Sequence, residues 1–122
     1  GDLRVAADPA DLAEAIGNVL DNAGKWARST IVVAGSRIGG MVSISIEDDG
    51  PGVAPSDYDS ILKRGNHAPD DSGGTGLGLA ITRDICQAYG ASITPGRSDL
   101  GGLWLKLDFP ANPSRRVHAS PA

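Results

Sequence analysis

The chain has 122 residues, enough for one domain with a single core but too few for two. Hydrophobic residues make up 40% of the chain and aromatic residues only 4%, so we expect a core of aliphatic side chains. A net charge of −4 argues against a nucleic-acid-binding surface, and a single cysteine excludes an internal disulfide and fits a reducing compartment. No apolar run approaches the roughly 18 residues that span a bilayer, and no export signal opens the chain.

The first elements are a short strand and a long helix. Leu3–Ala7 is an apolar run that predicts a strand, and it begins so early that we expect the chain to be a piece of something longer. Asp8 and Pro9 have the pattern of an N-cap followed by proline at the first helical position. Apolar residues then recur at helical spacing through positions 12–27, which predicts an amphipathic helix.

The same helix carries a polar stripe, formed by Glu14, Asn18, Asn22 and Lys25. Asparagine is a poor helix former, because its amide competes for backbone hydrogen bonds. Two asparagines one turn apart suggest a use for their carbonyl oxygens, which Mg²⁺ accepts as ligands together with water and phosphate oxygens. The alternative is an ordinary solvated helix face.

A hairpin is predicted next, and an acidic residue follows it. Ser29–Ser36 is β-branched, residues 37–40 form a turn, and Met41–Glu47 alternates apolar and polar residues. Asp48 continues the inward face of that strand, where an ionised carboxylate is costly without a partner. Such an acceptor, followed by two glycines, suits a ligand amino group such as that of adenine. The alternative is a turn in which Asp48 or Asp49 caps the local backbone.

The segment 53–72 is weakly patterned and contains one short predicted helix that ends at Ile61–Leu62. The rest is a long loop, which in a small domain is usually functional or disordered. Lys63 and Arg64 are candidates to reach a phosphate, with a solvated basic pair as the alternative. His67 is predicted to be an exposed loop residue rather than a catalyst.

A glycine-rich stretch, Ser72–Ile81, has glycines at 74, 76 and 78 and leads into a second helix with Gly90 at its end. The helix is predicted from the apolar positions Leu77, Ala80, Ile81, Ile85 and Ala88, and Cys86 within it is expected to be a small core or boundary residue. A glycine loop at a helix start can bind an anion, because the first N–H groups have no partner within the helix. Alone, this stretch could equally be a plain linker or turn.

The chain is predicted to end with two strands and a tail. Residues 91–95 form a short strand and 97–102 a turn, and apolar residues then alternate along Leu103–Pro110. Residues 111–122, rich in proline, serine and arginine, are predicted to be a disordered tail.

Taken together and in this order, three segments resemble the nucleotide-binding boxes of the GHKL superfamily, and the resemblance is greatest to the catalytic, ATP-binding domain of sensor histidine kinases. Gly17–Trp26 resembles the N box, Glu47–Val53 the G1 box and Gly74–Ile81 the G2 box. The resemblance implies a two-layer α/β sandwich of the Bergerat type, with three helices on a mixed five-stranded sheet. It also implies a catalytic domain over residues 1–110 with an ATP lid at about 53–74.

The resemblance also implies roles for single residues. Asn18 and Asn22 would hold Mg²⁺ and phosphate, Lys25 would contact phosphate, and Asp48 would accept from the adenine amino group. Gly50 and Gly52 would give the base room, and Arg64 would be a phosphate contact from the lid. The phosphate-binding loop would comprise Gly74, Thr75, Gly76, Leu77 and Gly78.

The function implied is transfer of the γ-phosphoryl group of ATP to a histidine on a separate dimerisation domain, with a response regulator downstream. Neither His67 nor His118 has the sequence context of that phosphoacceptor, so the domain is expected to be inactive alone and to contain no catalytic side chain of its own. We expect it to be a cytoplasmic monomer, or the cytoplasmic part of a membrane-bound sensor, that contacts neither nucleic acid nor membrane.

Two departures from the family pattern and three rival functions remain. The lid has Ile61 and Leu62 where a phenylalanine is usual, and Leu103 stands where the family often has a small or hydroxyl residue. The rivals are an ATPase, an anti-sigma-type serine kinase and a nucleotide-binding module without turnover. Related ATPases carry a glutamate at the position of Asn18, which favours transfer over hydrolysis.

Overall fold

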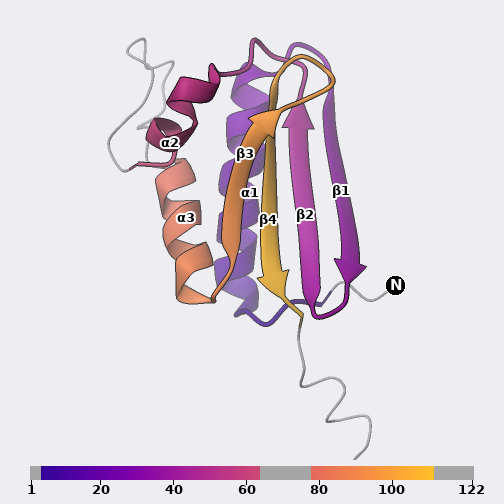
Figure 1. The fold of residues 1–122 in the computed structure, drawn as a ribbon, viewed down its shortest axis with the longest axis vertical. Coiled ribbons are helices and arrows are strands. Elements are labelled where there is room, and N and C mark those ends of the chain that lie inside the picture. The colour runs from indigo at the N-terminus through magenta and orange to yellow at the C-terminus, as the bar shows by residue number, and fades with distance from the viewer. Residues whose placement is uncertain (1–3, 64–77, 112–122) are drawn as a thin grey trace, which may run out of the picture.

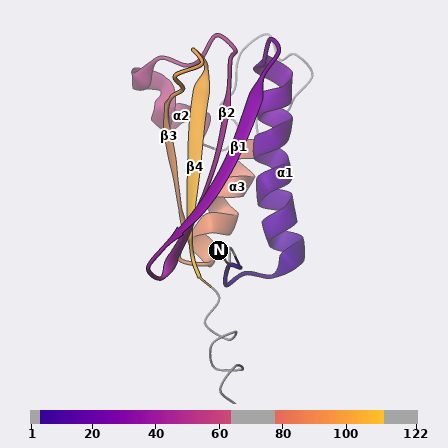
Figure 2. The same ribbon diagram turned by 90° about the vertical axis from the view of Figure 1, so that its right-hand side faces the viewer.

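The computed structural model describes residues 4–63 and 78–111. Its elements, shown in Figure 1, are helix α1 (Pro9–Trp26), strands β1 (Ile31–Ile38) and β2 (Met41–Asp48), a 3₁₀ turn (Pro55–Asp57), helices α2 (Tyr58–Ile61) and α3 (Gly78–Ala88), and strands β3 (Ser92–Arg97) and β4 (Leu103–Pro110). Figure 2 shows two layers, with α1 and α3 on one side of the sheet. The predicted two-layer α/β arrangement with three helices is therefore confirmed.

The sheet differs from the expected one. Its strand order is β1-β2-β4-β3 and each neighbouring pair is antiparallel, so the described residues form four antiparallel strands and not a mixed five-stranded sheet. The run predicted as a first strand contributes a single bridge, between Val5 and Ala111. Pairing stops there because the chain turns at once into α1, where Asp8 already caps the helix.

Helix α1 forms as predicted. The Asp8 side chain accepts a hydrogen bond from the Ala10 N–H at 2.8 Å, and Pro9 occupies the first turn. The buried face of the helix consists of Ala15, Val19 and Ala23. Two of these three side chains are a single methyl group, so the helix can approach its neighbours closely along this face.

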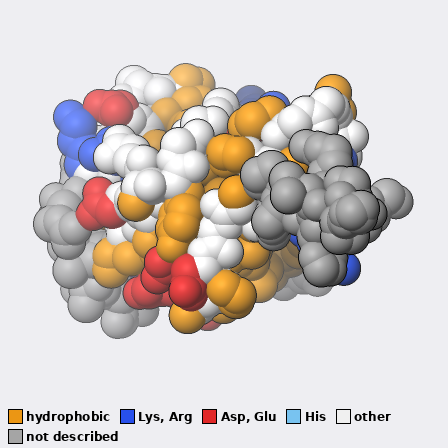
Figure 3. Space-filling view, turned by 90° about the horizontal axis from the view of Figure 1, so that it is seen from below, with side chains coloured by type: hydrophobic (Ala, Val, Ile, Leu, Met, Phe, Trp, Pro, Cys, Tyr) orange, Lys and Arg blue, Asp and Glu red, His pale blue; other side chains and the backbone are white. Residues whose placement is uncertain are grey.

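The β1–β2 hairpin is longer than predicted, because β1 continues to Ile38 and the turn consists of Gly39 and Gly40. Gly39 has a φ of +61°, which a residue with a side chain rarely adopts. β1 lies at the sheet edge, and nearly all of its side chains are exposed. Figure 3 shows the end of the molecule that carries the β1–β2 turn, where hydrophobic side chains reach the surface. Ile38, the last residue of β1, is 76% exposed.

The core lies between the sheet and the two long helices. The predicted inward face of β4 is confirmed, because Leu103, Leu105, Leu107 and Phe109 are all buried. Helix α3 is rotated from the predicted apolar face: Thr82 and Cys86 are fully buried, whereas Ala88 is exposed. Thr82 is tolerated inside because its hydroxyl donates to the Ala15 carbonyl at 3.0 Å.

Two side chains, one in α3 and one just after its end, bond this helix to α1 and its N-cap. The hydrogen bond from Thr82 to Ala15 connects the middle of the two helices. Near the end of α3, the Tyr89 hydroxyl donates to the Asp11 carboxylate and accepts from the Asp8 N–H. The hydrogen bond to Asp11 raises the pKa of Tyr89. Burial raises the pKa of Cys86 to about 11, so this thiol stays protonated and unreactive at neutral pH, as expected for a core residue.

The prediction for the end of α3 is confirmed by Gly90, which has a φ of +70°. Within the ranges 4–63 and 78–111, no helix is both long enough and apolar enough to cross a bilayer.

Candidate nucleotide-binding site

The start of α3 lies against the middle of α1. A Cβ placed on Gly78 would lie 3.7 Å from the Cβ of Asn18, so the last glycine of the predicted phosphate loop and the first asparagine of the polar stripe are neighbours. The side-chain nitrogen of Asn18 is buried and has no hydrogen-bond partner among the described residues. A buried donor without a partner is costly, and here it lies beside a helix N-terminus, where N–H groups favour an anion.

The two other polar positions of α1 continue toward its C-terminus. Asn22 is half-buried one turn after Asn18, and Lys25 is exposed in the last turn. Because residues three and four apart share a helix face, the three polar side chains follow one another along α1. Their roles toward Mg²⁺ and phosphate stay predictions.

Asp48 ends β2 as an enclosed carboxylate that is only 2% exposed, as its inward parity predicts. Its Oδ1 accepts from the N–H of Gly50 at 2.8 Å and from the N–H of Leu103 at 3.4 Å. Among the described residues no hydrogen bond to Oδ2 is found, and the contact of this oxygen with a ligand amino group stays a prediction. Both protein donors are backbone groups, and the Leu103 side chain is itself buried.

Glycines around Asp48 make close backbone packing possible. A Cβ on Gly50 would lie 2.4 Å from the Trp26 carbonyl oxygen, and one on Gly102 would lie 2.1 Å from Asp48 Oδ1. Gly52 has a φ of +75° and packs against the Gly101 carbonyl. The absent side chain of Gly50 thus makes room for the end of α1, and its expected role of giving the base room stays a prediction. Gly102 was not among the predicted site residues, although the Gly-Gly pair before β4 is a visible signal.

Asp49 is a second residue that the sequence did not single out, except as an alternative backbone cap. Its carboxylate accepts from the N–H groups of Arg28, Ser29 and Thr30 at 2.8, 3.1 and 3.2 Å, and from the Ser29 hydroxyl at 2.8 Å. Hydrogen bonds from the Ser29 backbone and hydroxyl, with those of the neighbouring amides, hold the pKa of Asp49 well below its usual range. Asp49 thereby ties the α1–β1 connection to the loop that carries Asp48.

Replacing Asp49 with asparagine is expected to lower stability at neutral pH and not in strong acid. The folded state has the lower pKa, so the ionised carboxylate stabilises the fold above its unfolded pKa of about 3.9. This contribution is lost as the pH falls through that value toward the folded pKa. Thermal unfolding between pH 7 and pH 2 measures the difference between the two proteins. Asp57→Asn, at an exposed position, is the control, and a difference that does not depend on pH would contradict this account.

Several predicted site residues lie outside the described residues, namely Arg64, Gly74, Thr75, Gly76 and Leu77. The second half of the expected lid, from residue 64 onward, lies outside them too, as do His67 and His118. Lys63 is described and forms an exposed ion pair with Asp59 at 3.1 Å. Such a pair is worth little, so it would not prevent Lys63 from moving to another anion.

The residues fit a magnesium–nucleotide complex better than a metal held by protein alone. Within the described ranges, no three histidine, cysteine, aspartate or glutamate side chains converge as metal ligands. Mg²⁺, however, commonly keeps its waters and takes one or two protein oxygens together with substrate phosphates. The paired amides of Asn18 and Asn22, next to a helix N-terminus, match that requirement.

This fold, with a buried acid and a polar helix face beside a helix start, defines a nucleotide-binding domain of the α/β sandwich class. Residues 7–113 match the family model "Histidine kinase-, DNA gyrase B-, and HSP90-like ATPase". The chain belongs to this family, as an ATP-binding catalytic domain of the sensor histidine kinase type.

Individual relatives agree. The chain is 41% identical over 115 residues to the sensor protein kinase CarS of Pseudomonas aeruginosa, covering 94% of this chain and 26% of that protein. The mycobacterial sensor histidine kinase MprB superposes with a TM-score of 0.81 at 28% identity, covering 88% of this chain and 75% of that one. Full-length ShkA in complex with AMPPNP has a TM-score of 0.75 at 31% identity, covering 87% of this chain and 22% of that one. This chain thus spans about a quarter of CarS.

Proposed function

We propose that the domain binds Mg²⁺–ATP between α1, the start of α3 and the loop after β2, and that it transfers the γ-phosphoryl group to a histidine on a separate helical dimerisation domain. The observation that supports the proposal is the contact between Asn18 and Gly78, which sets the start of α3 against the polar stripe of α1. The loop that follows Asp48 packs against the C-terminal end of the same helix, since a Cβ on Gly50 would lie 2.4 Å from the Trp26 carbonyl oxygen.

The proposed roles follow from the chemistry of each group. Asp48 Oδ2 accepts from the adenine amino group, and the orphaned amide nitrogen of Asn18 donates to a phosphate oxygen. The side-chain oxygens of Asn18 and Asn22 would hold Mg²⁺, which neutralises phosphate charge when it is bound. Lys25 and the N–H groups at the start of α3 add positive potential. Phosphoryl transfer depends on such positioning and neutralisation more than on a side-chain nucleophile.

The glycine loop and lid complete the proposal. Gly74, Thr75, Gly76 and Leu77 would supply amides to the phosphates together with Gly78, and Arg64 would contact phosphate from a lid at about 53–74. The catalytic domain would span residues 1–110, and 111–122 would be a tail. We further propose a cytoplasmic domain, monomeric in isolation, whose partners are the dimerisation domain of the same kinase and a downstream response regulator.

Phosphotransfer is tested by incubating the chain with γ-labelled ATP and a supplied histidine-bearing dimerisation domain of a related kinase. Label is expected on that domain, and on none of its variants that lack the histidine. Label on serine would indicate the serine-kinase function instead. Free phosphate release without protein labelling would indicate an ATPase, and nucleotide binding without either would indicate a non-catalytic module.

Replacing Asn22 with alanine is expected to remove most of the Mg²⁺ dependence of ATP binding, because a carbonyl oxygen is lost from the metal's ligands. Calorimetric titrations with and without Mg²⁺ measure this effect. Glu14→Ala, at an exposed position on the same stripe, should keep the wild-type metal dependence. If Asn22→Ala also keeps it, Asn22 is not a metal ligand.

A further inference from the structure

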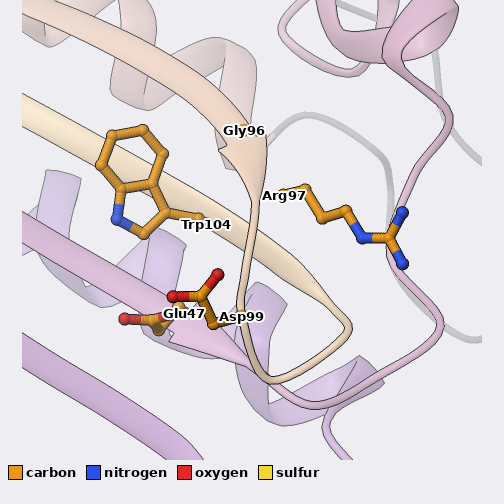
Figure 4. Close-up of a pocket in the computed structure, with 5 residues that line it drawn as sticks. All are labelled: Glu47, Gly96, Arg97, Asp99 and Trp104. Carbon is orange, nitrogen blue, oxygen red and sulfur yellow. The ribbon is translucent and has the colours of Figure 1, made fainter.

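A pocket of about 390 Å³ lies on the face of the sheet that the helices leave open, and it is lined by Glu47, Gly96, Arg97, Asp99 and Trp104 (Figure 4). Glu47 and Trp104 alternate along their strands with the inward-facing Asp48 and Leu103, so they point away from the nucleotide site. The pocket is therefore separate from the site proposed for ATP.

The indole of Trp104 forms one wall. Trp104 pairs with Glu47 on β2 and with Gly96 on β3, so the three residues form a row across the sheet. A Cβ on Gly96 would lie 2.7 Å from the Trp104 ring, and the glycine thus lets the indole lie over β3. The Lys106 Nζ lies 5.9 Å from the centre of the ring, which shows that the ring is within reach of a cation.

Two carboxylates form the opposite wall. Figure 4 shows those of Glu47 and Asp99 beside each other, with the Arg97 side chain directed away from them. Glu47 is held in place by the Ser98 hydroxyl, which donates to it at 2.6 Å from a buried position. Among the described residues neither carboxylate forms an ion pair, and Lys106 pairs with Asp108 instead. Two like charges therefore face one pocket, and the Arg97 guanidinium, which also lines it, pairs with neither of them.

We propose that this pocket binds an arginine side chain of a partner protein. A guanidinium group is planar, stacks on an indole and can donate to two carboxylates at once. An ammonium group is a compact point charge, so it does not stack on the ring and lacks the forked donor geometry. The net charge of −4 adds to the attraction for a basic segment. Two carboxylates without a third ligand are a poor site for a metal ion, and the open polar pocket is a poor site for an apolar ligand.

The test titrates the 122-residue chain with the peptide acetyl-Gly-Arg-Gly-amide in the absence of nucleotide, followed by ¹H–¹⁵N NMR. The Trp104 indole N–H and the amides of Glu47 and Asp99 are expected to shift and to saturate. The Trp26 indole, the other tryptophan of the chain, should not move. The same peptide with citrulline, which is nearly the same shape but uncharged, should give no saturable shift, and the lysine peptide should bind more weakly.

Single variants decide whether these residues form the site. Glu47→Gln and Asp99→Asn should each weaken binding of the arginine peptide by about two- to fivefold, and Trp104→Leu should also weaken it. Asp57→Asn removes an exposed charge elsewhere and should leave the affinity unchanged. Equal binding of the citrulline peptide, or wild-type affinity in both carboxylate variants, would overturn the proposal. Saturable shifts at the same amides with MgCl₂ alone would assign the pocket to a metal ion instead.

Discussion

Replacing Asp48 with asparagine is expected to weaken Mg²⁺–ATP binding by about 5- to 150-fold, equivalent to about 1–3 kcal/mol for a lost charged hydrogen bond. Asp48 is 2% exposed, and its Oδ1 is already occupied by two backbone N–H groups. An amide there either gives up those bonds or turns an N–H₂ toward the adenine amino group. Either arrangement sets a donor against a donor. Isothermal titration calorimetry measures the loss.

A change of base separates recognition by Asp48 from a general loss of folding. Inosine triphosphate carries a carbonyl oxygen where ATP has the amino group. The ratio of the affinity for inosine triphosphate to the affinity for ATP should therefore be higher in the asparagine variant than in the wild-type protein. The thermal unfolding midpoint reports whether the variant is folded. If the variant loses affinity equally for both nucleotides while remaining folded, Asp48 does not contact the base.

Replacing Gly102 with alanine is expected to disrupt the loop after β2 and to abolish measurable nucleotide binding. A Cβ at this position would lie 2.1 Å from Asp48 Oδ1, 2.4 Å from the Asp48 carbonyl oxygen and 2.7 Å from the Gly50 nitrogen. Two of these three atoms belong to the backbone, so rotation of one side chain cannot relieve the overlap. We expect a cost of about 1–3 kcal/mol in stability, as for other overpacked sites. Thermal unfolding and ATP titration measure both effects.

Gly40→Ala is the matched control, because a Cβ at that position meets nothing within 4 Å. This variant should have a free energy of unfolding within about 0.5 kcal/mol of the wild-type value, and its nucleotide affinity should be unchanged. If Gly102→Ala behaves like the control, the loops around Asp48 are looser than the structure indicates, and Gly102 has no part in shaping the site.

Local signals in the sequence were strong enough to predict several elements. The cap and proline at Asp8 and Pro9, followed by an apolar helical period, located α1 correctly. Strict alternation located β2 and β4, and the same parity predicted that Asp48 faces inward. These predictions succeeded because each depends on a hydrophobic periodicity or a helix cap that lies entirely within one short segment of the sequence.

Other features depend on contacts between distant segments, which the periodicity of one segment does not contain. Thr82 is buried because the Ala15 carbonyl on another helix accepts its hydroxyl, and so α3 is rotated from the face that Ile81 and Ile85 predict. The position of the Asp49 carboxylate is set by hydrogen bonds from backbone amides about 20 residues earlier in the chain. The apolar run at Ile31–Val33 predicted a strand correctly, but its edge position and exposure follow from the sheet order.

The most direct test of the nucleotide-binding account is an NMR titration of this chain with Mg²⁺ and AMPPNP. The account predicts saturable binding of one nucleotide, with shifts at the Asn18 and Asn22 side-chain amides and at the backbone amides of Gly50, Gly78 and Leu103. Shifts confined to the open face of the sheet around Trp104, or no saturable binding, would contradict it.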